Sequence, residues 1–329
     1  MKVRLLGPKA EQELEQFPEG PPPDLLVAAY LAWLLEQVWR EIDRRFRGPT
    51  VFLNLAAPMD HIENKALKER YLQIIHAAWS VTFSPTTMAN GVSLSNVEPL
   101  LKNLLLSPVP PTQERKFDVL PETIAPVVSL SLDPRTTTGN YLVMDMGAGT
   151  TEASLCMIGG HGAEQRITCY FDQTDLIGAD LFSDADRLAG EVRRERTEIL
   201  CRRLAKLAKH VWYEGFKKDK SSRATHDRWR RLKVLLAGGG TLRREVSETI
   251  RETDLLRHWF PDDPKPQVAR HCPIGIGAMS QVQDDLGMLA TAHGLTVERM
   301  QWPIWFPPNE VEVQPQPEVV QKNEAYWYV

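Results

Sequence analysis

Apolar side chains recur at helical spacing in the first part of the chain. Pro21 to Pro23 precede this pattern, and Asp24 stands where a helix N-cap would bond to free backbone amides. The apolar residues then fall along one stripe, at Val27, Leu31, Leu34, Leu35, Val38 and Ile42. A stripe of this kind predicts a helix that packs against a core and ends at Gly48-Pro49.

A strand and a second helix follow. Residues 50–56 (TVFLNLA) are rich in β-branched and aromatic types and predict a short buried strand. We expect the second helix over about residues 61–79 and a short one near residues 97–106, inside a stretch that is otherwise mostly loop. Helix, strand and helix in this order indicate one edge of an α/β layer.

The second half of the chain is richer in strands. Short glycine turns separate its apolar or alternating segments, so we expect antiparallel neighbours in one sheet. The predicted strands are residues 141–146, 152–158 and 167–171, and a further apolar strand covers residues 234–237. The predicted helices are residues 123–132, 176–212 and 241–252, and a proline-rich tail without periodicity follows residue 306.

Composition narrows the class of protein. The 329 residues are 43% hydrophobic and 25% charged, which fits a folded chain of two domains or two lobes. A net charge of −4 excludes a uniformly basic nucleic-acid binder. Cysteines without CxxC spacing indicate no disulfide scaffold, and the longest apolar run, Leu25–Leu35, is too short to span a bilayer. The first ten residues lack the apolar core of a secretory signal, so we expect a cytoplasmic protein without a membrane partner.

The sharpest local motif is the run from Asp145 to Glu152, DMGAGTTE. Its glycines and alanine let backbone amides approach an anion closely, and its two threonines add hydroxyl donors. Asp145, at the end of a buried strand, could hold a hydrated Mg²⁺ opposite the phosphates. A strand follows this turn, whereas a P-loop or a dinucleotide fingerprint needs a helix there. An ordinary glycine hairpin with a capping aspartate explains the motif equally well.

Two other motifs border strands. Gly238, Gly239 and Gly240 follow the apolar segment 234–237 and precede a helix, so a flat ring or a phosphate could lie against their backbone. A tight strand-to-helix turn is the simpler explanation of these glycines. Glu122 stands at a strand-to-helix junction, where an acid most often interacts with a helix N-terminus.

Taken in order, these motifs resemble the nucleotide-binding domain of DnaK-type heat-shock chaperones (Hsp70-like), within the actin-like ATPase superfamily. Residues 116–132 look like the first connecting segment of that family, residues 141–158 like its second phosphate-binding hairpin and residues 234–250 like its adenosine-binding segment. Residues 285–295 (DLGMLATAHGL) resemble its second connecting helix, and residues 177–180 resemble a glycine turn that borders the nucleotide.

The resemblance implies a role for each matching residue. Asp145 and Glu122 would position Mg²⁺ and the attacking water, with Asp145 holding the metal through water, and Gly178 would border the nucleotide. Residues that would meet the phosphates, or lie beside them, are Gly147, Ala148, Gly149, Thr150, Thr151 and Glu152. The residues that would approach the nucleoside are Gly238, Gly239 and Gly240.

The chain also departs from that family. Residues 1–23 do not contain the first phosphate-binding hairpin, an Asp-x-Gly-Thr-type turn. Ala148 and Ala179 replace glycines, and Leu242 stands where the family often has arginine. We therefore expect either an N-terminally incomplete chain or a degenerate relative that binds nucleotide weakly or not at all.

One segment is strongly basic. Between Arg193 and Lys233 there are 15 Lys or Arg against 5 Asp or Glu, which could contact a base and phosphates or form solvated helix faces. Aromatic residues lie among these charges at Trp212, Tyr213, Phe216 and Trp229, and amphipathic packing explains them without a nucleic-acid partner. His271-Cys272 has no second ligand pair nearby, so we expect no zinc site.

We therefore expect an α/β protein with the actin/Hsp70-like two-lobed ATPase fold, ribonuclease H-like lobes and an incomplete first lobe. The expected organisation is an N-terminal segment 1–23, a partial first lobe 24–140, a second lobe 141–306 with a basic helical subdomain at about 176–233, and a tail 307–329.

The expected function is a switch that binds ATP or ADP with Mg²⁺, hydrolyses ATP weakly and acts on a protein partner. Two alternatives stay open: a non-hydrolysing scaffold, which the missing hairpin favours, and an actin-like filament former. A sugar kinase is less favoured because the sequence offers no acceptor-activating aspartate in a recognisable place.

Overall fold

The chain is described here from a computed structural model. The described residues are 21–45, 52–85, 87, 91–110, 117–133, 136–160, 164–218, 232–253, 255, 267–270, 289–297 and 302–311. Expectations for residues 1–20, Trp229, His271-Cys272 and residues 312–329 lie outside them. Within the described helices, none has the length and apolar character needed to cross a membrane.

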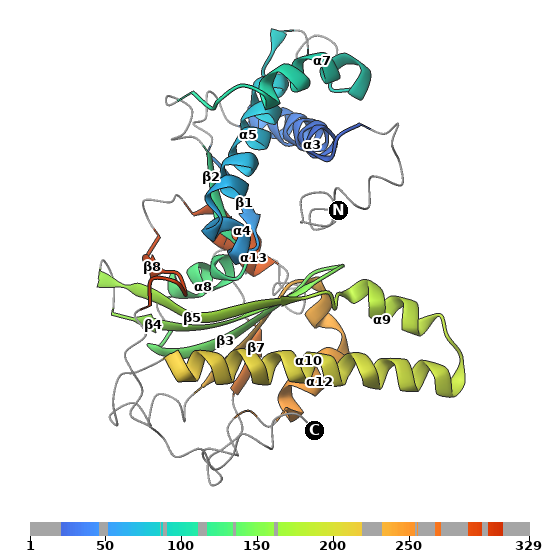
Figure 1. Ribbon diagram of the computed structural model, residues 1–329, viewed down its shortest axis with the longest axis vertical. Helices are drawn as coiled ribbons and strands as arrows, with labels where there is room; N and C mark the ends of the chain where they lie inside the picture. The colour runs from blue at the N-terminus through green and yellow to red at the C-terminus, as the bar shows by residue number, and fades with distance from the viewer. Residues whose placement is uncertain are drawn as a thin grey trace.

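The first lobe has the predicted helix–strand–helix order. Its two strands pair in parallel, from Leu53 opposite Phe117 to Ala57 opposite Pro121, and helices surround them (Figure 1). The elements are α3 (Pro23–Arg45), β1 (Leu53–Ala57), α4 (Met59–Glu63), α5 (Lys65–Thr82), α7 (Leu94–Leu105) and β2 (Phe117–Pro121). α8 (Ile124–Ser131) then leads to the second lobe.

α3 turns a different stripe to the core than the sequence pattern predicts. Its buried residues are Leu25, Val27, Ala28 and Ala32. Leu34 and Val38 are instead 39% and 46% exposed, because apolar residues encircle this helix and two buried alanines let α5 approach most closely. Asp24 lies in the first turn of α3 and not at the predicted N-cap position, and its two carboxylate oxygens accept from Arg70 Nε at 3.0 and 2.8 Å.

The second lobe is built on a six-stranded sheet in the order β7-β6-β3-β4-β5-β8. Its strands are β3 (Gly139–Met146), β4 (Thr151–Gly159), β5 (Arg166–Asp175), β6 (Lys233–Ala237), β7 (Gln267–Arg270) and β8 (Ile304–Phe306). β3, β4 and β5 are antiparallel neighbours as predicted, whereas β6 is parallel to β3, β7 to β6 and β8 to β5. Three antiparallel strands flanked on the β3 side by two parallel ones form a ribonuclease H-like lobe, which confirms the expected fold class.

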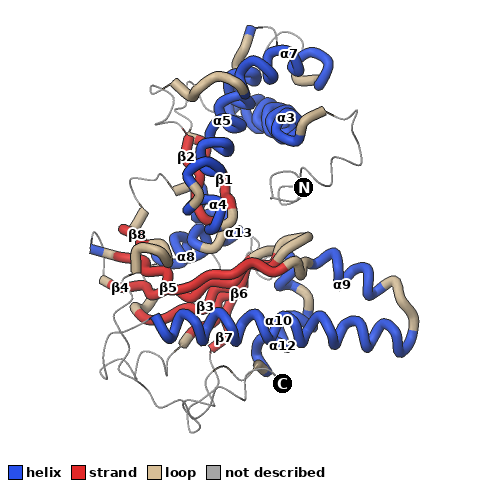
Figure 2. Tube along the Cα trace, viewed as in Figure 1, coloured by secondary structure: helices blue, strands red, loops and turns tan. Residues whose placement is uncertain are grey.

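Helices cover both faces of this sheet (Figures 1 and 2). On one face lie α9 (Ala179–Asp186), α10 (Gly190–Lys218) and α12 (Arg244–Glu252), which follows a short 3₁₀ turn, η3 (Gly239–Leu242). On the other face, between the sheet and the first lobe, lie α8 and α13 (Leu289–Thr296). Side chains alternate along β3, so Leu142 and Met144 meet α10, whereas Tyr141 and Val143 face α8.

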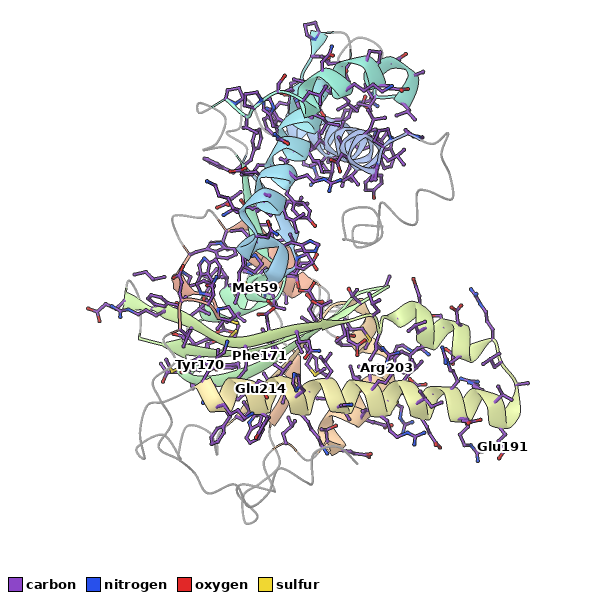
Figure 3. All side chains as sticks on the ribbon, in the orientation of Figure 1. Met59, Tyr170, Phe171, Glu191, Arg203 and Glu214 are labelled. Carbon is purple, nitrogen blue, oxygen red and sulfur yellow. The ribbon has the colours of Figure 1, made fainter. Side chains whose placement is uncertain are left out.

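The junction of the two lobes is apolar. Met59 of α4 is 2% exposed and packs in one cluster with Leu120 of the first lobe and Val143 of the sheet. Figure 3 shows Met59 between the helices of the first lobe and the sheet. Burial of this kind opposes separation of the lobes by roughly 25 cal/mol for each Å² of apolar surface removed from water.

The aromatic residues of the basic segment pack inside the protein. Trp212 is 1% exposed and stacks on Phe216 with ring centroids 5.3 Å apart. One continuous helix, α10, carries both residues and lies along the sheet, with charged residues such as Arg203 and Glu214 beside its buried stripe (Figure 3). Amphipathic packing therefore accounts for Trp212, as the sequence suggested.

We predict that Trp212→Ala lowers the free energy of unfolding by about 3–5 kcal/mol, because it leaves a large cavity under α10. Trp33→Ala is the matched control: Trp33 is 46% exposed, and its removal should change stability by about 0.5 kcal/mol or less. Urea unfolding followed by circular dichroism measures both changes. Equal losses in the two variants would contradict this description of the core.

Candidate functional site

β3 and β6 bring two glycine-containing turns to one edge of the sheet. The strands are parallel neighbours, with Asp145 opposite Ala237. Residues 147–150 follow β3, and residues 238–240 follow β6. Because parallel neighbours end at the same edge of a sheet, the two turns adjoin there, and such an edge is where open α/β sheets bind ligands.

The turn between β3 and β4 is held from behind by the chain that leads into α9. Gly147 N–H donates to the Thr150 carbonyl at 2.9 Å and closes the turn. The carbonyls of Gly147 and Ala148 accept from the amides of Ala179 and Asp180, each at 2.9 Å. Within the described part of the chain, the amides of Ala148, Gly149 and Thr150 form no hydrogen bond, so they remain available to an external acceptor.

The fold itself does not require the two glycines of this turn. Neither Gly147 nor Gly149 has a left-handed φ, and a Cβ built on Gly149 would meet no atom within 4 Å. A Cβ on Gly147 would only touch the Thr150 carbonyl oxygen at 3.8 Å. Because glycine has no side chain, the backbone of these two exposed residues is open to solvent, and a ligand could approach it closely.

Gly178, in contrast to Gly147 and Gly149, has no room for a side chain. It is buried, and a Cβ there would lie 2.0 Å from the Ala148 carbonyl oxygen and 2.5 Å from the Gly149 carbonyl carbon. Only glycine lets the start of α9 pack against the turn. The structure therefore places Gly178 beside the predicted phosphate-binding residues, as a support beneath them.

Asp145 lies between the second turn and α13. Its Oδ2 accepts a hydrogen bond from Thr291 Oγ1 at 2.6 Å. Gly238 has φ +77°, and a Cβ there would lie 2.2 Å from Asp145 Oδ1 and 2.5 Å from the Met146 carbonyl oxygen. Gly238 is thus required both by its backbone conformation and by its contact with the carboxylate.

The other two glycines of the second turn differ from each other. Gly239 is exposed, so its backbone is open to a ligand. Gly240 is buried, and a Cβ there would lie 2.3 Å from Met146 Cγ. Packing against β3 therefore accounts for Gly240, whereas Gly239 has the open position expected of a nucleoside contact.

Thr151 and Glu152 belong to the interior of the sheet. Thr151 is fully buried and its hydroxyl donates to the Ile177 carbonyl, so this hydroxyl is committed to the fold. Glu152 is 3% exposed and lies opposite Asp145 in the strand register. Thr150 remains partly exposed in the turn, and it is the threonine of this motif that a phosphate could reach.

Glu122 lies at the junction of the lobes. It follows β2 directly, and its backbone amide donates to the Ala57 carbonyl at 2.9 Å. α8 begins two residues later and packs on the same face of the sheet that carries Tyr141 and Val143. By the alternation along β3, Asp145 belongs to that face of the sheet too.

α13 contacts both lobes. The Asn54 side-chain amide of β1 donates to the carbonyls of Leu295 and Val297, at 2.7 and 3.2 Å. A Cβ on Gly294 would lie 1.8 Å from the Ala125 carbonyl oxygen of α8, so the helix backbones touch. Thr291 of the same helix binds Asp145 in the second lobe. The sequence motif located this helix but did not single out Thr291. The sequence alone does not show which side of the helix faces Asp145.

Arg243 supplies a cation beside the second turn. Its backbone amide donates to the Gly240 carbonyl at 3.3 Å, and its guanidinium carbon lies 5.5 Å from the Phe182 ring centroid. It pairs with Asp186, whose other oxygen accepts from Arg193 at 2.8 Å. The Arg243 hydrogen bond is the main cause that lowers the pKa of Asp186. Sequence reasoning noted the loss of arginine at position 242 and missed its neighbour.

Asp145 could hold a metal ion that is also coordinated by the phosphates of a bound ligand. No group of three or more His, Cys, Asp or Glu that could hold a metal occurs among the described residues. Mg²⁺ commonly keeps several waters and uses one or two carboxylates together with substrate phosphates. Asp145 alone is therefore compatible with that coordination.

Comparisons with known proteins found solved structures of low sequence identity. No protein-family model matches the chain, and no curated protein is similar to it. The ethanolamine utilization protein EutJ from Carboxydothermus hydrogenoformans is 13% identical, with a TM-score of 0.37 over 82% of this chain and 73% of EutJ. MreB 5 of Spiroplasma citri bound to AMPPNP is 11% identical, with a TM-score of 0.40 over 81% and 74%.

A third solved structure, the PilM–PilN type IV pilus biogenesis complex, is 16% identical, with a TM-score of 0.39 over 81% of this chain and 84% of the other. None of the three is a DnaK-type chaperone, so that finer part of the resemblance stays a prediction. At these TM-scores the fold assignment rests on the strand order of the second lobe.

We predict that Gly178→Ala destabilises the protein by about 1–3 kcal/mol, because its methyl group would overlap the Ala148 carbonyl. Gly149→Ala is the matched control, since its methyl group would meet open space and stability should stay within about 0.5 kcal/mol. Thermal and urea unfolding measure both. A stable Gly178→Ala variant would disprove the close packing of α9 against the turn.

Stability should also depend on pH through α13. Burial lowers the pKa of His293, whose Nδ1 lies 2.9 Å from Ser129 Oγ, below the ordinary value of 6.5. The unfolded chain therefore binds the proton more readily, so the His293 contribution to stability is present above pH 6.5 and lost as pH falls through the lowered pKa.

We predict that the difference in unfolding free energy between wild type and His293→Gln shrinks as pH falls below 6.5. Urea unfolding of both proteins at several pH values measures this difference. A difference between wild type and His293→Gln that grows on acidification would contradict the assignment.

Proposed function

We propose that the chain binds a nucleoside di- or triphosphate, ATP or ADP, at the sheet edge where β3 and β6 end. The observation that carries this proposal is the turn of residues 147–150. Its amides at Ala148, Gly149 and Thr150 have no partner within the described part of the chain, and the fold does not require its glycines. Successive unpaired amides of this kind form a favourable setting for an anion.

The second turn supports the same ligand. Gly239 offers bare, exposed backbone next to the first turn, and Arg243 stands behind it. A phosphate chain on residues 147–150 would therefore direct the nucleoside toward Gly239 and Gly240. Packing against Met146 restricts Gly240, so in this proposal Gly239 makes the closer approach.

Asp145 is the residue proposed to hold Mg²⁺ through water. When bound, the ion would neutralise negative charge on the phosphates. The carboxylate lies at the carboxyl end of β3, beside both turns, and one of its oxygens already accepts a hydrogen bond. Its Oδ1 lies against Gly238.

The finer function is a nucleotide-dependent switch that acts on a protein partner, as the DnaK-type resemblance implies. Glu122 borders the lobe junction, where it could help Asp145 to position an attacking water. The described sheet of the first lobe consists of two parallel strands and so contains no hairpin that could clamp the phosphates from the opposite side. We therefore propose binding as the main activity and hydrolysis as weak.

We predict that wild type binds ATP and ADP in the presence of Mg²⁺ and that Asp145→Asn loses the Mg²⁺-dependent part of the affinity, about tenfold or more. Asparagine keeps the shape of the side chain and an oxygen that can accept from Thr291, so the fold is retained. Calorimetric titrations with Mg²⁺ and with EDTA measure this effect, and Asp184→Asn, at an exposed ion pair on α9, is the control. Equal Mg²⁺-dependent affinity in Asp145→Asn and wild type would contradict the proposal.

The same titrations separate the competing functions. Binding without phosphate release indicates a non-hydrolysing scaffold, and sedimentation with ATP reveals a filament former. A folded chain that binds neither ATP nor ADP would overturn the proposed site itself.

A further inference from the structure

Thr291 connects the proposed nucleotide site to the helix that joins the lobes. Its hydroxyl donates to Asp145 Oδ2 at 2.6 Å, although the two residues are 146 positions apart in sequence. This oxygen–oxygen distance falls in the range of about 2.5–2.7 Å that is typical of hydrogen bonds to an ionised carboxylate. A helical threonine hydroxyl often bonds to a carbonyl of the preceding turn, whereas this one is directed to another element.

The two oxygens of Asp145 are constrained by different elements. Oδ2 is held by Thr291 of α13, and Oδ1 lies so close to Gly238 that a Cβ there would be 2.2 Å away. Rotation of the carboxylate would break the first contact or crowd the second. The orientation of Asp145 is therefore set from outside its own strand.

α13 is in turn fixed to the first lobe. Asn54 of β1 donates two hydrogen bonds to carbonyls at the end of this helix, and Gly294 packs against the backbone of Ala125 in α8. A movement of the first lobe that carried α13 with it would pull Thr291 relative to Asp145. Conversely, a ligand that reorients Asp145 would bias the position of α13, because coupling between two sites is reciprocal.

We propose that Thr291 is a positioning residue, which holds the Asp145 carboxylate in the orientation needed for Mg²⁺ and so links occupancy of the site to the position of the first lobe. This inference rests on the proposed nucleotide function. Thr291 itself is not proposed to touch the nucleotide. Its contribution is the direction of one carboxylate oxygen.

The test compares Thr291→Val, which keeps the β-branched shape and removes the hydroxyl, with Thr291→Ser, which keeps the hydroxyl. We expect Thr291→Val to bind Mg²⁺·ADP about tenfold more weakly than wild type, the loss of one hydrogen bond to a charged group. ADP affinity in EDTA should be unchanged, and Thr291→Ser should recover the Mg²⁺-dependent part. Thr296→Val, at an exposed position of the same helix, is the control.

Thr291→Ala provides a second hydroxyl deletion if Thr291→Val does not fold, with folding checked by circular dichroism. Mg²⁺-dependent affinity equal to wild type in a folded hydroxyl-deleted variant would overturn the inference. Failure of Thr291→Ser to restore that affinity would do so as well, since it would assign the loss to packing.

A second readout needs no nucleotide. The Asp145 carboxyl carbon of the free protein, followed by NMR at one pH, should resonate at a different position in Thr291→Val than in wild type and return in Thr291→Ser, because the hydrogen bond to Oδ2 is lost and then restored. An unchanged resonance in Thr291→Val would show that Thr291 does not control Asp145. If wild type binds no nucleotide, the proposed function fails, and this resonance still decides whether Thr291 controls the carboxylate.

Discussion

The parallel pairing of β3 with β6 is the constraint on which the whole site depends. Its register sets Asp145 opposite Ala237, so both strands end together and their turns adjoin. A slip of one residue would move Asp145 to the face covered by α10, because side chains alternate along a strand. Buried apolar clusters on both faces oppose such a slip, since it would exchange the side chains that fill them.

The same architecture links the position of Asp145 to the position of the first lobe. The face of the sheet that carries Asp145 is covered by α8 and α13, and both helices also contact the first lobe. The opposite face is covered by α9, α10 and α12. A rearrangement between the lobes would therefore move helices that contact the site. The strands of the site stay fixed because helices pack on the opposite face of the sheet.

Sequence patterns predicted much of the fold. The runs at residues 141–146 and 234–237 are apolar almost throughout, as strands buried on both faces must be, and both became neighbours in the sheet. β7 and β8 were missed because four and three residues are too few to establish a period. The buried stripe of α3 was misjudged because apolar residues surround that helix, and only tertiary packing selects one side.

The sequence located the motif from Asp145 to Thr150, but it did not show which glycines of the site the fold requires and which leave backbone open to a ligand. Only contacts distinguish Gly149, which the fold does not need, from Gly178 and Gly240, which it does. Thr291 and Arg243 were missed because each meets the site from a separate element of the chain.

The most direct test is an amide NMR spectrum of the deuterated full chain during titration with Mg²⁺·ADP. Saturable shifts are expected at Ala148, Gly149 and Gly239, whereas saturable shifts confined to other surfaces, or none at all, would contradict nucleotide binding at this edge of the sheet.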